Sequence, residues 1–441
     1  MKIYFPALAC LVLCTQLACA QHTVSDPYLP ALKEVTADET FLASDALRGR
    51  KTFSPDIVKA SSFIEDKFRA DGLIPFFGND FKESFFLNTT TNVSSSLSIN
   101  GKVVPDSLYL ALSGTPHINL KADSFNVVTV PAGMNVAERR TLLTPYFQAG
   151  SLLKNNVLVV LDPSLRPYMA RIKHYSLPSL VNDQKTVLVV FGTAAPVNIE
   201  YKAENTISRQ ALNNVAAVLP GTERPDEYVI FSAHYDHLGT GPSPSAMREP
   251  VPGQDSIFNG ANDDASGTTA VIELARYFSR THTNKRSIIF VTFTAEEIGE
   301  YGSQYFSMHV DNQKVIAMFN IEMIGTGSKW GNNAAYITGY DKTDFGKILQ
   351  KNLKGSAFNF YPDPYPAQDL FYRSDNAQLA LKGVPAHTIS TSKMDDEHNY
   401  HTPQDEISTL DLTNMTQIID AIAISSKGII SGKDTPGRVT Q

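Results

Sequence analysis

Five residues of the types that bind transition metals stand at separate points in the second half of the chain. They are His234, Asp263, Glu297, Glu322 and His401. Imidazole and carboxylate groups are ordinary zinc ligands, and a catalytic zinc keeps a position open for water or substrate. The three carboxylates carry a charge of −3, so two Zn²⁺ ions with a bridging hydroxide would leave the site near neutral. Two metals about 3.5–4 Å apart need a shared carboxylate and can activate water.

Each of these residues also has an ordinary structural explanation when it is taken alone. A histidine at a strand end more often makes a structural hydrogen bond than a metal bond. Adjacent glutamates such as Glu296 and Glu297 are usually solvated, and Asp263 with Asp264 in a glycine-containing loop is typical of turn chemistry. The prediction of a two-metal site therefore depends on the complete set.

Hydrophobic patterning places most of the candidates where strands end. We expect strands at residues 228–233, 287–294 and 315–321. His234 follows the first strand, Glu296 and Glu297 follow the second, and Glu322 ends the third. Sites in open α/β sheets form at the carboxyl edge of the strands, so these side chains should converge.

The other candidates lie in loops. A polar loop at 262–267 leads into an expected helix at 268–278, and His401 lies in a later loop. Asp236 comes two residues after His234 and could accept the second ring N–H of that imidazole, which would fix its tautomer.

Strands and helices alternate from about residue 205 onward. This order predicts an α/β fold with a mixed, mostly parallel sheet covered by helices on both faces. A strand at 385–390 and a closing helix around 415–422 complete it, and an amphipathic helix at 54–72 precedes it. Residues 88–203 differ in composition: they begin with a run rich in Ser, Thr and Asn and contain short segments with the pattern of β-strands. We therefore expect an inserted, strand-rich domain at 88–203 within a main domain formed by 21–87 and 204–441.

Residues 1–20 have the features of a secretory signal peptide. Lys2 gives a positive start, an apolar run follows that is too short to span a bilayer, and small residues end at Ala20. The mature chain would begin at Gln21 and be secreted or periplasmic. Cleavage before Cys19, as in a lipoprotein, is the weaker alternative because Gln16 stands where an apolar residue is wanted. We expect no membrane span after the leader.

Composition limits the function further. All three cysteines lie in the predicted leader, so the mature chain would have no disulfide. The net charge of −7 argues against a nucleic-acid partner. It leaves small molecules and peptides as substrates. The sequence does not indicate an oligomeric state.

Five ordered motifs resemble those of the zinc-dependent aminopeptidases, peptidase family M28, which also includes glutamate carboxypeptidases and, more distantly, glutaminyl cyclases. They are His-Tyr-Asp at 234–236, Asn-Asp-Asp-Ala-Ser-Gly at 262–267, Ala-Glu-Glu at 295–297, Asn-Ile-Glu-Met-Ile-Gly at 320–325 and His-Thr-Pro-Gln-Asp at 401–405. The resemblance covers roughly residues 30–85 and 205–430. It implies a zinc exopeptidase fold with two zinc ions and a peptide substrate. Residues 88–203 would occupy the place of the family's inserted, PA-like lid domain.

The resemblance also implies a role for each candidate. Asp263 would bridge the two metals, Glu297 and His401 would complete one of them, and His234 and Glu322 the other. Glu296 would be the general base, a role that typically contributes about 10²–10⁴-fold. Four further residues would support the site. Asp236, Asp264 and Asp375 would lie around the metal ligands, and Tyr400 would help to stabilise the oxyanion.

Two positions depart from the family pattern. The family usually has Asp where this chain has Glu322, which keeps the charge but adds a methylene. Ser374-Asp375-Asn376 stands where relatives often have Ser-Asp-His. Asp375 could equally cap a helix.

The motifs leave several functions open. An aminopeptidase acting on free N-termini is the first interpretation. A carboxypeptidase or dipeptidase of the same family would need the same ligands. A glutaminyl cyclase with one zinc is disfavoured by the Asp-rich loop at 262–267. A binding ectodomain without metals is disfavoured by the complete ligand set and by Glu296.

Overall fold

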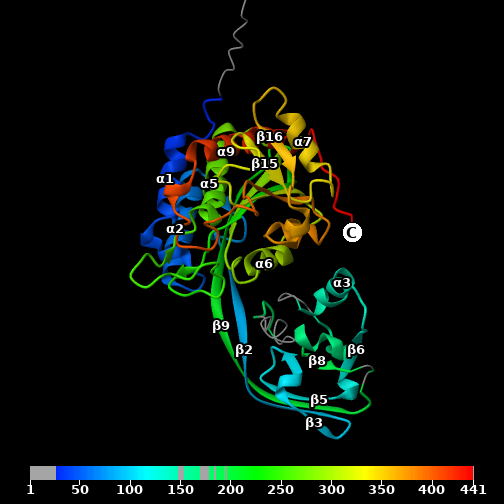
Figure 1. Cartoon of the computed structure of the whole chain (residues 1–441). Helices are drawn as coiled ribbons and strands as arrows, with labels where there is room; N and C mark the ends of the chain where they lie inside the picture. The colour runs from blue at the N-terminus through cyan, green and yellow to red at the C-terminus, as the bar shows by residue number, and fades with distance from the viewer. Residues whose placement is uncertain are drawn as a thin grey trace, which may run out of the picture.

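The computed structural model describes residues 26–147, 153–168, 178–182, 185–192, 194 and 196–440. Figure 1 shows a larger lobe of helices around a sheet and a smaller lobe joined to it by two long strands. The predicted leader, its cleavage position before Gln21 and all three cysteines lie outside the described residues. None of the helices in the described part has the length and apolar character that crossing a membrane requires.

A mixed sheet forms the centre of the larger lobe. Its order is β16-β15-β17-β14-β10-β13-β9-β2-β3. The middle strands are β10 (Arg224–His234), β13 (Arg286–Phe293), β14 (Val315–Ile321) and β17 (Ala386–Ser390). Strand β10 runs parallel to β13 and β14, and β14 runs parallel to β17. β15 (Ala334–Ile337) is antiparallel to β17 and parallel to β16 (Asn359–Pro362).

Helices cover both faces of this sheet, and each face has its own apolar core. One face packs on α1 (Leu32–Leu42), α2 (Pro55–Ala70), α5 (Ser266–Thr281), α7 (Phe345–Asn352) and α9 (Leu412–Ile430). The other packs on α6 (Tyr301–His309) and α8 (Asn376–Ala380). Along β13, Phe290 faces the first core and Ile289 the second. Since side chains alternate across a strand, a strand buried on both faces has an almost continuous apolar sequence.

Two long strands connect the lobes. β2 (Lys82–Ile99) and β9 (Ile199–Leu219) pair antiparallel along almost their whole length (Figure 1). Near their far end β9 also pairs with β5 (His117–Lys121), and β2 pairs with β3 (Lys102–Val104). A four-stranded sheet in the smaller lobe has the order β4-β8-β7-β6, from β4 (Tyr109–Leu112), β8 (Val187–Phe191), β7 (Asn156–Leu161) and β6 (Phe125–Val130). Helix α3 (Val136–Phe147) lies in the same lobe (Figure 1).

The structure confirms the α/β fold class with its central mixed sheet between helices. Helix α2 begins as the sequence predicts, because the Ser54 hydroxyl accepts a hydrogen bond from the Ile57 N–H at 3.3 Å and Pro55 occupies the first turn. The division at residues 88 and 203 stays a prediction. Both positions fall inside β2 and β9, which continue without a break from one lobe to the other.

Candidate metal centre

The carboxyl ends of three parallel strands bring the first candidates together. In the pairing of β10 with β13, His234 stands opposite Phe293, so Glu296 and Glu297 follow directly beside it. On the other side of β10, Ser232 stands opposite Asn320 of β14, and Glu322 comes two residues later. Parallel pairing without a shift in this region therefore delivers all four side chains to one edge of the sheet.

The loop before α5 supplies Asp263, and two other carboxylates hold this loop in place. It is a π-helical turn, Ala261–Ala265, whose Asp263–Asp264 peptide bond is cis. Asp405 accepts the backbone N–H groups of Asn262 at 2.8 Å and Asp263 at 3.0 Å. Asp264 accepts from the N–H groups of Gly267 at 3.0 Å, Met323 at 3.1 Å and His234 at 3.3 Å. It thereby ties the loop to the ends of β10 and β14.

Asp263 lies between two imidazoles. Its Oδ1 is 3.2 Å from His234 Nε2, and its Oδ2 is 3.2 Å from His401 Nε2. Each ring turns its other nitrogen, Nδ1, toward a backbone carbonyl: Asp236 O at 3.1 Å for His234, and Ser245 O at 2.8 Å for His401. Carbonyl partners of this kind fix the tautomer so that the free Nε2 lone pair can bind a metal. The Asp236 carboxylate, which we expected from the sequence to accept this ring N–H, lies 3.8 Å from His234 Nδ1. The partner of the ring is therefore the main-chain carbonyl of Asp236 and not its side chain.

The donor atoms fit a zinc ion in spacing and in charge. His401 Nε2 is 3.1 Å from Glu297 Oε2 and 3.2 Å from Asp263 Oδ2. Ligands about 2.0–2.1 Å from a tetrahedral zinc lie about 3.3 Å from one another. Burial opposes ionisation of Glu297, as does the charge of Asp263, but the imidazoles of His237 and His401 outweigh both and lower the pKa of Glu297 to about 2. Asp263 is also held ionised, since His234 and His401 keep its pKa well below the usual value against the effect of burial.

Glu296 and Glu322 have the opposite electrostatics. Burial raises the pKa of Glu322 to about 7, and its Oε2 has no hydrogen-bond partner among the described residues. Burial, with the nearby charges of Glu322 and Glu297, also holds the pKa of Glu296 well above the usual value. The backbone N–H of Glu296 donates to Asp236 Oδ1 at 3.1 Å, while Asp236 Oδ2 accepts from the Thr52 hydroxyl at 2.7 Å. Asp236 therefore positions the backbone of Glu296.

The structure also places Tyr400 and Asp375 near this group. The ring of Tyr400 stacks on His401 with 3.8 Å between centroids, and burial raises the pKa of its hydroxyl. Asp375 precedes α8 but its side chain makes no capping hydrogen bond, which does not support the helix-cap alternative. Burial holds the pKa of Asp375 well above the usual value, and the charges of Glu300 and Glu322 act in the same direction.

Three residues near the site were given no role by the sequence reasoning. His237 Nδ1 lies 2.6 Å from Glu297 Oε1, and His237, Asp263 and Glu297 are close enough to share one ion. Asp405 holds the Asp263 loop, and Arg50 contacts the same loop from the N-terminal segment. His237 directly follows the His-Tyr-Asp motif, so its position was a usable signal. Arg50 offers no such signal because it is more than 180 residues from its partner Tyr235.

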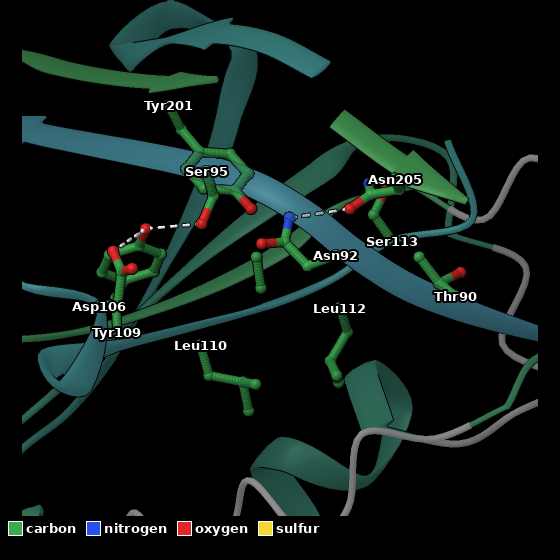
Figure 2. Close-up of a pocket in the computed structure, with 11 residues that line it drawn as sticks. Thr90, Asn92, Ser95, Asp106, Tyr109, Leu110, Leu112, Ser113, Tyr201 and Asn205 are labelled. Atoms are coloured by element: carbon green, nitrogen blue, oxygen red, sulfur yellow. Dashed lines mark hydrogen bonds between the residues drawn. The ribbon is translucent and has the colours of Figure 1, made fainter. Parts of the chain in front are cut away.

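Two cavities lie in different lobes. A small one, about 60 Å³, borders the cluster: Glu322, Tyr400 and Arg373 line it together with Met323, Tyr336 and several hydroxyl side chains. A larger one, about 310 Å³, lies in the smaller lobe (Figure 2). Its described lining is uncharged except for Asp106, which accepts from the Tyr109 hydroxyl at 2.9 Å. None of the predicted site residues lines this larger cavity.

Sequence comparison bears on the same region of the chain. The profile of peptidase family M28 matches residues 214–425, which include every predicted metal ligand. This part of the chain is similar to peptidase family M28. Among curated M28-like relatives, a probable zinc metalloprotease of Pyrenophora teres f. teres is 34% identical over 131 residues, 29% of this chain and 26% of that protein. A vacuolar membrane protease of Schizosaccharomyces pombe is 22% identical over 271 residues, 59% of this chain and 29% of that protein. The chain thus spans less than a third of the length of either relative.

Solved structures share this fold over nearly the whole chain. An aminopeptidase from Aneurinibacillus sp. strain AM-1 superposes with a TM-score of 0.51 at 16% identity, covering 93% of this chain and 95% of that one. A zinc aminopeptidase from Bacillus subtilis gives a TM-score of 0.52 at 17% identity, covering 92% and 97%. At such low identities the likeness establishes the fold alone.

Proposed function

We propose that this chain is a secreted exopeptidase that holds two zinc ions and removes residues from the free amino ends of peptides. The observation that supports two metals is the position of Asp263, whose two carboxylate oxygens each lie 3.2 Å from a different imidazole. His234 and Glu322 would hold one zinc, Glu297 and His401 the other, with Asp263 between them. The relatives described as zinc metalloproteases and zinc aminopeptidases agree with this metal.

The chain's own residues can carry the proton transfers of hydrolysis. Two zinc ions, when bound, would make a water more acidic and polarise the carbonyl group of the scissile bond. The Glu296 carboxylate accepts the proton of the attacking water and returns it to the departing amine nitrogen. Burial raises the pKa of Glu296 above its usual value, which makes this carboxylate a stronger proton acceptor than an exposed glutamate. The Tyr400 hydroxyl stays protonated, because burial raises its pKa, and can donate to the developing oxyanion.

An excess of carboxylates favours an amino-terminal substrate. Glu296, Glu322 and Asp375 all influence one another electrostatically and are buried around the cluster. A protonated or neutral amine is favoured there, whereas a substrate carboxylate would be repelled. One observation supports the carboxypeptidase alternative: Arg373 is among the residues that line the small cavity, and a guanidinium can pair with a terminal carboxylate.

A panel of blocked peptides separates these functions. Acetylating the N-terminus of a good substrate should abolish turnover, while amidating its C-terminus should not.

A chelator should remove activity, and added Zn²⁺ should restore it with up to two ions per chain. The reverse blocking pattern, together with loss of turnover in Arg373→Gln, would assign the chain to the carboxypeptidases. Full activity without metal would refute the mechanism. Secretion is tested by the exported protein's mass, which should correspond to a start at Gln21.

A further inference from the structure

A third histidine lies beside the predicted ligands and has no role in the mechanism so far. The His237 side chain is fully buried, with Nδ1 2.6 Å from Glu297 Oε1 and 3.9 Å from Asp263 Oδ2. Two arrangements would place an imidazole there. It could bind a metal directly, or it could donate a hydrogen bond to the carboxylate that does.

The distances distinguish these arrangements. His401 Nε2 lies 3.1 and 3.2 Å from the oxygens of Glu297 and Asp263, close to the separation of about 3.3 Å between two ligands of one tetrahedral zinc. The 2.6 Å between His237 Nδ1 and Glu297 Oε1 is shorter than that and typical of a hydrogen bond to a charged oxygen. Because a carboxylate only accepts, His237 Nδ1 must carry the proton.

The other ring nitrogen supports the same tautomer. His237 Nε2 is buried and has no hydrogen-bond partner among the described residues. If Nδ1 carries the proton, Nε2 is an acceptor without a partner. If Nδ1 were bound to a metal, Nε2 would be an N–H donor without a partner. A buried donor without a partner is rarer in proteins than a buried acceptor without one. His234 and His401 differ, since each gives Nδ1 to a backbone carbonyl and keeps Nε2 toward the carboxylates.

The surrounding backbone fixes the ring. Gly260 has φ +57°, and a Cβ at this position would lie 2.6 Å from the His237 ring. Arg50 Nη2 donates to Gly260 O at 3.0 Å, and the His237 N–H donates to Arg50 O at 3.3 Å. The imidazole therefore fills a space that only glycine leaves open, and its reach to Glu297 is set by backbone rather than by a mobile side chain.

We propose that His237 is a positioning residue: its Nδ1–H holds Glu297 Oε1, so that only Oε2 faces the metal beside His401. The inference rests on the proposed function, because it takes Glu297 as a zinc ligand. Removing an outer partner of a metal ligand typically weakens metal affinity about 10–100-fold. The ring thus helps to set the affinity of one of the two metal positions.

Amide isosteres test the proposal through zinc affinity, independently of activity. The Asn side-chain nitrogen occupies the position of His Nδ1, whereas the Gln nitrogen reaches the position of Nε2. Chelator-stripped wild type, His237→Asn, His237→Gln and His237→Leu would be titrated with Zn²⁺ against a chromophoric chelator, with circular dichroism confirming the fold. We expect His237→Asn to keep wild-type affinity within about threefold, and the Gln and Leu variants to lose about 10–100-fold at one of two sites.

Two outcomes would overturn the inference while leaving the proposed function intact. If His237→Asn loses as much affinity as His237→Leu, the imidazole is itself a ligand. If His237→Leu binds zinc like wild type, the ring has no positioning role. Wild type that binds no zinc would instead refute the proposed function, and the inference with it.

Discussion

Glu296 and Glu297 are neighbours in sequence, and the fold gives their carboxyl groups opposite properties. Glu297 faces His237 and His401, and its pKa falls to about 2 despite burial. Glu296 has His234 Nε2 at 3.9 Å, but burial and the charges of nearby carboxylates outweigh this imidazole and hold its pKa well above the usual value. An acid that stays ionised can bind a metal, and an acid whose pKa is raised accepts a proton more readily. Two adjacent residues therefore suit two different roles because of their partners.

Substituting each glutamate in turn should separate those roles. Glu296→Gln removes the proton acceptor and keeps the shape, so kcat should fall about 10²–10⁴-fold with zinc content unchanged. Glu297→Gln removes a charged ligand and should lose zinc. Steady-state kinetics alongside elemental analysis of both variants measures this. Equal loss of zinc in the two would mean that Glu296 is also a ligand.

Glu322 is the position where this chain leaves the family pattern. Glu322→Asp restores the usual residue, but the strand and loop are arranged around the longer side chain. Shortening by one methylene withdraws the carboxylate by about 1.5 Å, whereas zinc–ligand distances tolerate about 0.2 Å. We expect weaker binding of the zinc held with His234, a lower kcat, and little change at the other zinc. Zinc titration of apo wild type and variant checks this. Unchanged affinity at both sites would remove Glu322 from the ligand set.

At the scale of the elements, Arg50 joins the N-terminal segment to the site. The side chain is fully buried and donates to the carbonyls of Leu42 at 2.5 Å, Asn259 at 2.6 Å, and Tyr235 and Gly260 at 3.0 Å. These carbonyls belong to α1, the residue that follows β10 and the loop before Asp263. One guanidinium thus satisfies backbone groups from three segments, as its fixed fork of donors allows.

Arg50→Met should destabilise the protein strongly, since it leaves buried carbonyls unpaired at about 1–3 kcal/mol for each unsatisfied group. We expect a loss of at least about 3 kcal/mol in the free energy of unfolding, measured with urea. Arg48→Met is the matched control. Arg48 also has a positive φ, but its side chain is exposed and lies 3.7 Å from Asp56, so the change should be within about 1 kcal/mol. Similar losses in both variants would mean that the backbone conformation, and not the buried guanidinium, matters.

These contacts mark the limit of what the sequence could predict. Periodicity and caps predicted α2, α5 and the central strands, because local patterns determine those elements. The rule that sites form at the carboxyl ends of strands in α/β sheets predicted that His234, Glu297 and Glu322 lie at one edge. Arg50 was not predicted, because its partners are backbone carbonyls, which no side-chain pattern encodes. Asp405 ends the His-Thr-Pro-Gln-Asp motif, but its role was not predicted, because its partners are backbone N–H groups. The continuation of β2 and β9 from one lobe into the other was not predicted from the sequence, because the far half of β2 is rich in Ser, Thr and Asn, a composition typical of loops.

At the scale of the whole molecule, that ribbon is the connection between the lobes (Figure 1). Where it leaves the main sheet, Glu83 of β2 stands opposite Asn214 of β9. The Asn214 amide donates to Glu83 Oε2 at 2.8 Å and to Gly302 O of α6 at 2.9 Å. The Thr294 N–H donates to Asn214 Oδ1 at 3.2 Å. The base of the ribbon is thus fastened to the larger lobe through one buried amide and one buried carboxyl group.

Burial raises the pKa of Glu83 to about 7 from 4.5. Between those pH values the folded chain keeps a proton that the unfolded chain releases, so this group makes stability fall as pH rises and level off above about pH 7. Glu83→Gln keeps the hydrogen bond without the charge. It should match wild type near pH 4.5 and exceed it at pH 8 by up to about 3 kcal/mol. Urea unfolding at both pH values measures this, with Glu200→Gln, exposed on β9, as a control expected to show no such pH-dependent gain. A Glu83→Gln variant no more stable than wild type at pH 8 would show that the fold accommodates the charged carboxylate.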